Sequence, residues 1–202
     1  MEIKERIVEG ARKMFMSEGV RRVTMDQIAK RLGVSKRTIY EHFTDKTQLL
    51  EATIDESTKL HDEYLKDVFT TSNDVIELVV AGLKFGVASL KEINPIYMED
   101  LQLYYPKVYG CSINQRRQEL TSGFEGLLTR GIKEGFFRSN INVKLVAKIF
   151  MEQINAMNNR EMFPVNEYPT SELFEALLLN FTRGISTLEG VKKLDCLLEA
   201  NT

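Results

Sequence analysis

The sequence contains only two cysteines and no long apolar run, and both features restrict the cellular compartment that we expect for the protein. The two cysteines, Cys111 and Cys196, lie far apart and match no metal-binding or redox spacing. No apolar run approaches the roughly 18 residues that a membrane-spanning helix needs. The charged start MEIKERIVEGARKMF lacks the apolar centre of a secretory signal. We therefore expect a cytoplasmic protein with reduced thiols and no membrane partner.

Proline and the motifs of common enzymes are scarce as well. The 202 residues contain only four prolines, and no alternating strand pattern is present, which favours helices throughout. There is no G-x-S-x-G motif, phosphate-binding loop, glycine-rich dinucleotide turn or His/Glu metal motif. His61 with Asp55 and Asp62 is the one grouping that resembles a metal site, and an ordinary helix position explains it better. We predict a protein that is not an enzyme and needs no cofactor; an all-α enzyme is the alternative.

Charge is distributed unevenly along the chain. Residues 1–46 contain eleven Lys and Arg against seven Asp and Glu, whereas the remaining residues contain sixteen against twenty-two. A basic segment ahead of an acidic body favours contact with a polyanion, although a chance fluctuation would give the same numbers. Within the basic segment, Arg21 and Arg22 are interpreted as a solvated loop rather than as base contacts.

The basic segment has the pattern of short helices. Apolar residues every four positions predict the first helix from about residue 3 to Glu18, and Gly19 ends it. Thr24 and Gln27 form a capping box at the start of a second helix, which stops at Gly33. Both helices therefore end at a glycine.

A third helix of two turns follows after only two residues. Ser35 can cap it, and Ile39 and Phe43, four residues apart, can bury one side of it. Two helices joined by so short a turn form a helix-turn-helix. Tyr40 then lies on the outer side of the third helix, one turn beyond Lys36, where burial does not explain an aromatic ring.

DNA contact explains the exposed tyrosine. In a helix-turn-helix the second helix of the pair enters the major groove with its N-terminal end first. This aims Lys36 and Arg37 at the groove, while Tyr40 can bond a phosphate or pack on a sugar or a thymine methyl. His42 and Lys46 are placed to hold the DNA backbone. The alternatives are a Tyr40 that only covers an arginine stem and a His42 that is simply solvated.

The segment TMDQIAKRLGVSKRTIYEHFTDKTQLL resembles the DNA-binding signature of the TetR/AcrR family of bacterial transcription regulators. The resemblance is close over residues 4–50, and beyond them it rests on helix count and on the phrases GIKEGFFR and LNFTRGIST. It implies an all-α fold of about nine helices, with a three-helix DNA-binding domain over 1–46 and a helical effector-binding and dimerisation domain over 47–202. The residues that it implies for DNA contact are Thr24, Ser35, Lys36, Arg37, Thr38, Tyr40, His42 and Lys46.

Apolar periodicity after residue 46 predicts six further helices and a C-terminal half-helix. Thr44 is expected to cap the first of them, with Asp45 in its first turn. Their expected ranges are about 45–69, 75–92, 95–105, 107–135, 142–159 and 170–188. The last two ranges carry more apolar surface than one core can use, so we expect a homodimer through them.

The body between the fourth and eighth helices is expected to bind a largely apolar effector with one polar or anionic handle. Arg117, on the inner side of its helix, is expected to pair with a carboxylate such as Glu99 or Asp100, to extend to solvent, or to receive an anionic ligand. The expected ligand-binding residues are His61, Tyr64, Phe85, Tyr105, Tyr109, Arg117, Phe150 and Gln153. The prediction is a ligand-responsive repressor that acts as a homodimer on a palindromic operator. A DNA-binding protein of the same fold without an effector is the alternative.

Overall fold

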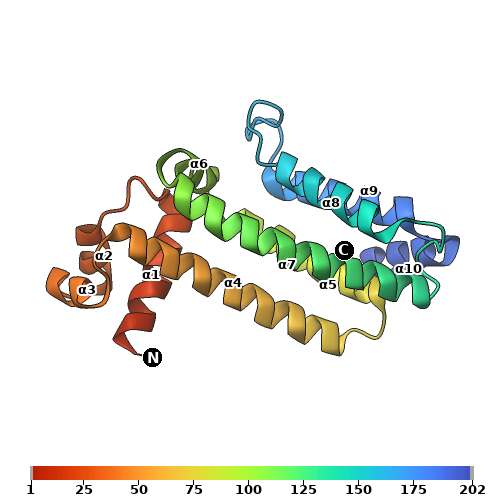
Figure 1. Cartoon of the computed structure of the whole chain (residues 1–202), viewed down its shortest axis with the longest axis horizontal. Helices are drawn as coiled ribbons and strands as arrows, with labels where there is room; N and C mark the ends of the chain where they lie inside the picture. The colour runs from red at the N-terminus through yellow and green to blue at the C-terminus, as the bar shows by residue number, and fades with distance from the viewer. Residues whose placement is uncertain (1, 201–202) are drawn as a thin grey trace. The chain divides into compact units, whose positions relative to one another are not determined.

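The structure is a computed structural model that describes residues 2–200; the side chains of residues 111–115, Cys111 among them, lie outside the description. Ten α-helices and no β-strand lie within residues 2–200, which confirms the predicted all-α class (Figure 1). The helices are α1 Ile3–Glu18, α2 Met25–Leu32, α3 Lys36–His42, α4 Lys46–Thr71, α5 Val75–Glu92, α6 Pro95–Tyr104, α7 Pro106–Lys133, α8 Val143–Ala156, α9 Thr170–Ile185 and α10 Leu188–Glu199.

Two expectations about helix ends are wrong. Thr44 does not cap α4: the Asp45 carboxylate accepts the Gln48 backbone N–H at 2.9 Å, while the Thr44 backbone N–H donates to the Gln48 side chain. The carboxylate directly before the first turn therefore takes the capping position. The tail forms a full helix, α10, rather than a half-helix, because Thr187 caps it and Leu194 is completely buried.

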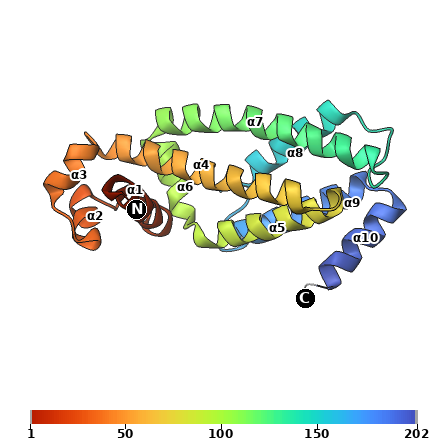
Figure 2. The ribbon, with the colours of Figure 1, turned by 90° about the horizontal axis from the view of Figure 1, so that it is seen from below.

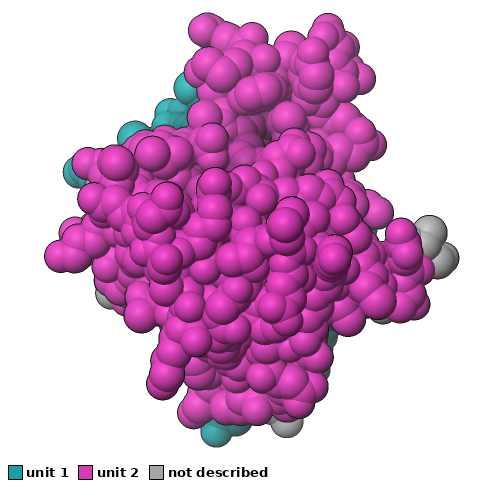
Figure 3. Space-filling model, turned by 90° about the vertical axis from the view of Figure 1, so that its right-hand side faces the viewer, with its two compact units in different colours: residues 1–64, 92–114 teal, residues 65–91, 115–202 magenta. Residues whose placement is uncertain are grey.

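The chain divides into two compact units, which Figure 3 colours separately. Unit 1 comprises residues 1–64 and 92–114, and unit 2 comprises residues 65–91 and 115–202. Unit 1 therefore joins α6 to the three N-terminal helices. The predicted division of function after residue 46 stays a prediction. Within residues 2–200, no helix is both long and apolar enough to cross a lipid bilayer.

The core of unit 1 forms where α1, α2, α3 and the start of α4 meet α6. Its buried side chains include Ile7, Ala11, Phe15, Val23, Ile28, Ile39 and Phe43, whereas Leu32 is only half-buried. α6 lies against α1 (Figure 2), and its Asn94 donates from the backbone N–H to the Met16 carbonyl at 2.7 Å. The Asn94 amide also donates to the Ser17 carbonyl at 3.1 Å. α6 thus satisfies carbonyls that the end of α1 leaves without helical partners.

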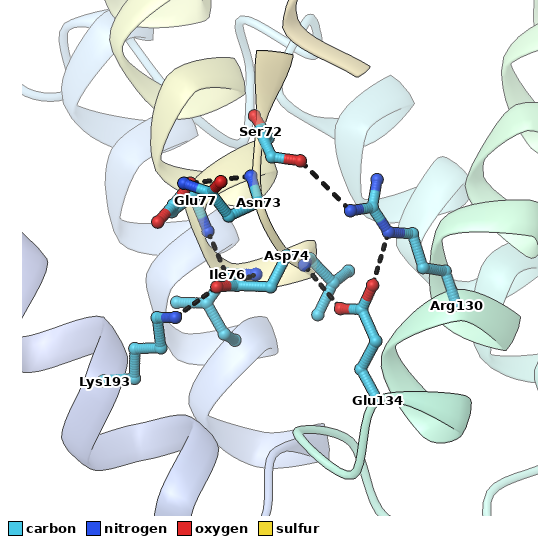
Figure 4. A network of polar contacts seen from close by, with 9 residues as sticks. Ser72, Asn73, Asp74, Ile76, Glu77, Arg130, Glu134 and Lys193 are labelled. Carbon is cyan, nitrogen blue, oxygen red and sulfur yellow. Dashed lines mark hydrogen bonds and ion pairs between the residues drawn. The ribbon is translucent and has the colours of Figure 1, made fainter. Parts of the chain in front are cut away.

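Unit 2 has its own core, built from α5, α8, α9, α10 and the second half of α7. A polar network holds its α4–α5 turn (Figure 4). Glu134 accepts the Val75 backbone N–H at 2.7 Å and also pairs with Arg130. Asp74 caps α5 and is paired with Lys193 of α10. The network therefore fixes α10 and the α4–α5 turn to the end of α7.

Candidate nucleic-acid interface

Local capping interactions build the helix-turn-helix as the sequence predicts. The Gln27 backbone N–H donates to the Thr24 hydroxyl at 3.2 Å, and the Gln27 side chain accepts the Thr24 backbone N–H at 2.8 Å. Gly33 ends α2 in the left-handed conformation, with φ 65° and ψ 33°. Ser35 caps α3 by accepting the Thr38 backbone N–H at 2.9 Å. The capping box, the glycine turn and the second cap are all confirmed.

α3 has one buried and one exposed side. Ile39 is completely buried and Phe43 nearly so, whereas Tyr40 is 45% exposed. The Lys36 ammonium lies 6.0 Å from the centre of the Tyr40 ring. The expected outward position of Tyr40 beside a cation is therefore confirmed. An exposed ring and cation form a surface that can contact both the apolar and the anionic parts of a ligand.

The cations of α3 have only exposed partners. Lys36 pairs with Asp26 of α2 at 2.7 Å, and Arg37 pairs with Glu41 at 3.0 Å, with more than half of each side chain exposed. The hydrogen bond and charge of Asp26 raise the pKa of Lys36, so this side chain stays cationic. Exposed ion pairs of this kind are worth about 0–1 kcal/mol, and phosphate can replace the carboxylates at little cost.

The remaining expected DNA contacts lie around the same helices. Thr38 is half-buried, and its hydroxyl bonds that of Ser35 at 2.8 Å. His42 is half-buried at the end of α3. Lys46 is held on the flank of unit 1, where its ammonium donates to the Arg21 carbonyl at 3.4 Å and lies 5.9 Å from the Phe15 ring centre. Burial lowers the pKa of Lys46, and the charge of Asp100 acts in the opposite direction.

Arg21 is exposed, as expected, but it makes contacts that the sequence interpretation did not predict. Its backbone N–H donates to Asp100 at 2.7 Å, and its guanidinium donates to the Tyr104 hydroxyl at 2.9 Å. Both partners lie on α6, about 80 residues further along the chain. Arg21 is therefore bound rather than simply solvated, and no local signal in the sequence marks these contacts.

The expected effector residues are divided between the two units. In unit 1, His61 and Tyr64 are half-buried on α4. Burial raises the pKa of Tyr105, and the charge of Asp100 adds to this effect. The Tyr109 hydroxyl accepts a hydrogen bond from the Gln102 amide at 3.0 Å. Contact of these four side chains with a ligand stays a prediction.

In unit 2, Arg117 pairs with Glu152 of α8, so the expected pairing with a carboxylate is confirmed, but the partner is neither of the two examples, Glu99 and Asp100. α7 and α8 flank one open groove of about 660 Å³. The side chains of Arg117 and Glu152 both line this groove, which brings them together. Phe150 stacks on Phe124 with ring centres 4.4 Å apart, in the buried core. Phe85 is half-buried on α5, and Gln153 is exposed on α8 rather than directed inward.

Comparison with known proteins finds similarity to one family of regulators over the N-terminal helices. The sequence pattern of the family "Bacterial regulatory proteins, tetR family" matches residues 7–53, which contain most of α1, all of α2 and α3, and the start of α4. Over these residues the chain is therefore similar to this family. An HTH-type transcriptional regulator of Staphylococcus aureus (strain USA300) is 35% identical over 80 residues, which cover 38% of this chain. The match spans only 43% of that curated relative.

Solved structures of TetR-family and other regulators share the fold over 91% of this chain. A TetR-family transcriptional regulator from Agrobacterium tumefaciens superposes with a TM-score of 0.73 at 15% identity, covering 91% of this chain and 97% of that one. A transcriptional regulator from Saccharomonospora viridis in complex with choline gives a TM-score of 0.69 at 18% identity, covering 91% and 97%. At these identities the likeness concerns the fold alone.

Proposed function

We propose that this chain is a sequence-specific DNA-binding transcription regulator of the TetR family with α3 as its recognition helix. The observation that carries the proposal is the two-sided character of α3, which buries Ile39 and exposes Tyr40 beside Lys36. Folding alone requires only the buried side. A duplex offers phosphates to the cation, and sugars and thymine methyls to the ring.

The test begins with selection of a binding sequence from random duplex DNA, followed by gel-shift titration at several salt concentrations. We expect Lys36→Ala with Tyr40→Ala to weaken binding of the selected duplex at least tenfold, with unchanged thermal unfolding. Lys192→Ala, which removes an exposed lysine of α10 in unit 2, is the charge-matched control. Wild-type affinity in the double variant would refute the assignment of α3.

We propose that the regulator acts as a homodimer through α8 and α9 on a palindromic operator. Leu145 is 54% exposed and Ile149 is 45% exposed on α8, which supports a covered apolar face. The neighbouring helix α9 exposes small or polar residues, Ala176, Asn180 and Gly184, which allow close approach of a second helix. A twofold copy would cover both helices in a four-helix bundle.

Sedimentation tests the dimer directly. Wild type should sediment as a dimer at micromolar concentration, and Leu145→Asp with Ile149→Asp should sediment as a folded monomer. The selected DNA should contain two half-sites about one helical turn apart or slightly more. A monomeric wild type that binds a single half-site would contradict the proposal.

We propose repression relieved by a small effector, as the finer form of this function. The effector would favour a separation of the two recognition helices that no longer matches the half-sites, which requires different affinities for the two states. The regulator from Saccharomonospora viridis, in complex with choline, supports a small-molecule site in this fold. Arg117, paired with Glu152 beside an open groove, is our candidate for the handle.

The effector proposal is tested with Arg117→Ala against a panel of candidate inducers. Loss of the response, with thermal stability and DNA affinity intact, supports Arg117 as the handle. A sharp fall in stability instead assigns Arg117 a structural role. If no compound in a broad panel changes DNA affinity of the wild type, the alternative of an effector-free DNA-binding protein is favoured.

A further inference from the structure

α6 holds Arg21 by two separate contacts. The backbone N–H of Arg21 is bound by Asp100, which is only 5% exposed, at 2.7 Å. The guanidinium carbon lies 4.8 Å from the centre of the Tyr104 ring, and one terminal nitrogen donates to the Tyr104 hydroxyl at 2.9 Å. The first contact fixes the α1–α2 turn, and the second fixes the direction of the side chain.

This arrangement leaves most of the guanidinium available. An arginine carries five N–H donors, of which the Tyr104 hydroxyl takes one. Arg21 is exposed, and Tyr104 is half-exposed. A guanidinium held on an aromatic ring is pre-organised for bidentate binding of an oxyanion, because its rotamer is already fixed. The site therefore presents donors to solvent instead of using them within the fold.

The position of Arg21 fits contact with the DNA backbone. It lies three residues before Thr24, which caps α2, and its carbonyl accepts the Lys46 ammonium at 3.4 Å. The α1–α2 turn, the start of α2 and the start of α4 thus share one edge of unit 1. Thr24 and Lys46 are both among the DNA contacts expected from the sequence.

We infer that Arg21 is a further DNA-phosphate ligand, and that Tyr104 and Asp100 of α6 are positioning residues that present it. The inference rests on the proposed DNA-binding function and extends it to a helix outside the helix-turn-helix. Contact between Arg21 and phosphate then depends on where α6 lies. DNA affinity is linked in this way to a segment of the chain that does not itself touch DNA.

The salt dependence of binding gives the expected size of the effect. Each phosphate contact contributes about 0.9 to the slope of log affinity against log salt concentration. Removing one contact therefore changes the ratio of affinities at 50 and 200 mM salt by about 3.5-fold, and removing one per subunit of a dimer by about 12-fold. This loss should be the same for the selected duplex and for an unrelated one, since phosphate carries no sequence information.

The experiment compares the single variants Arg21→Ala, Tyr104→Ala and Tyr104→Phe with the double variants that combine Arg21→Ala with each Tyr104 change. A further double variant combines Arg22→Ala with Tyr104→Ala. Arg22→Ala is the matched control, because Arg22 is also exposed in the turn but makes no hydrogen bond or ion pair among residues 2–200. Gel-shift titrations at 50–200 mM salt on both duplexes give affinities and slopes. Thermal unfolding shows that each variant is folded.

We expect Arg21→Ala to lower the salt slope by the calculated amount. Tyr104→Ala should produce at least half of that change, and Tyr104→Phe should give a slope between those of the wild type and Tyr104→Ala. In the Arg21→Ala background, Tyr104→Ala should cause no further change in the salt slope. In the Arg22→Ala background, Tyr104→Ala should lower the salt slope by as much as it does in the wild type. Additive effects of Arg21→Ala and Tyr104→Ala, an unchanged slope in Arg21→Ala, or tighter binding by Tyr104→Ala would each overturn the inference. If Tyr104→Ala does not fold, the same comparison of salt slopes with Tyr104→Phe tests the inference. A wild type that binds no duplex would instead overturn the proposed function, and this inference with it.

Discussion

Replacement of Gly19 by alanine should destabilise unit 1 severely, because two independent constraints meet at this residue. Gly19 ends α1 with φ 86° and ψ 154°, a backbone conformation that is essentially restricted to glycine. A Cβ at this position would lie 2.8 Å from the Asp100 carboxylate and 2.8 Å from Ile96, both on α6. Separations under 3.0 Å are essentially never found in real structures, so the Asp100 and Ile96 side chains, α6 or the turn would have to move.

The two constraints allow the size of the effect to be estimated. Backbone strain of this kind costs about 1–3 kcal/mol, and overpacking a tight contact costs about another 1–3 kcal/mol. Gly19→Ala should therefore lower the free energy of unfolding by about 2–6 kcal/mol, a large part of the roughly 5–15 kcal/mol of a typical domain. Displacing α6 gives little relief, because it breaks the hydrogen bond between Asp100 and Arg21.

Urea unfolding followed by circular dichroism measures this loss, with Gly33→Ala as the matched control. Gly33 also has a positive φ, but no atom lies within 4 Å of its would-be Cβ. Backbone strain is therefore its only penalty, about 1–2 kcal/mol. Equal losses in the two variants would show that contact between α6 and the α1–α2 turn is not as close as described, and would refute the reasoning.

Two further predictions concern acid unfolding and base recognition. Burial by itself would raise the pKa of Asp74, but hydrogen bonds from Lys193 and from the backbone N–H groups of Glu77 and Ile76 outweigh it and lower this pKa. A carboxyl with a lowered folded-state pKa stabilises the fold above its unfolded pKa, about 3.9, and loses that contribution as the pH falls through the folded value. The stability difference between wild type and Asp74→Asn should therefore shrink from pH 5 to pH 3 in urea titrations, and a constant difference would contradict the ion pair. Arg37→Ala should cost about 1–3 kcal/mol at one or two base pairs in competition assays with singly substituted duplexes; uniform weakening on all duplexes would place Arg37 on phosphate instead.

The sequence predicted correctly the structural features that depend on residues within four positions of each other. Thr24 and Gln27 cap the same turn, and Gly33 and Ser35 mark the end of one helix and the start of the next. The spacing of Ile39 and Phe43 gives the buried side of α3 directly. Such local patterns determine helix existence and direction, and they sufficed for the fold class and for the exposed position of Tyr40 beside Lys36.

The features that were missed depend on packing between distant segments. The contacts of Arg21 with α6 join residues 79 and 83 positions apart. Glu152 became the partner of Arg117 because α8 flanks the same groove, a fact that helical periodicity does not contain. Several carboxylates lie at suitable spacing along the chain for each arginine. Choice among them follows from three-dimensional proximity, for which a single sequence gives no measure.

The composition of unit 1 from two separated segments has a consequence for synthesis on the ribosome. Tyr97, Leu101 and Val108 belong to the same buried cluster as the helices of the first 50 residues. At ribosomal rates of about 5–20 residues per second, the stretch from residue 64 to residue 114 takes about 3–10 s to appear. During that interval the nascent N-terminal helices lack part of their apolar cover. A chain truncated after residue 64 should therefore be prone to aggregation and a substrate for chaperones, whereas one that extends past residue 114 can close this core before unit 2 is complete.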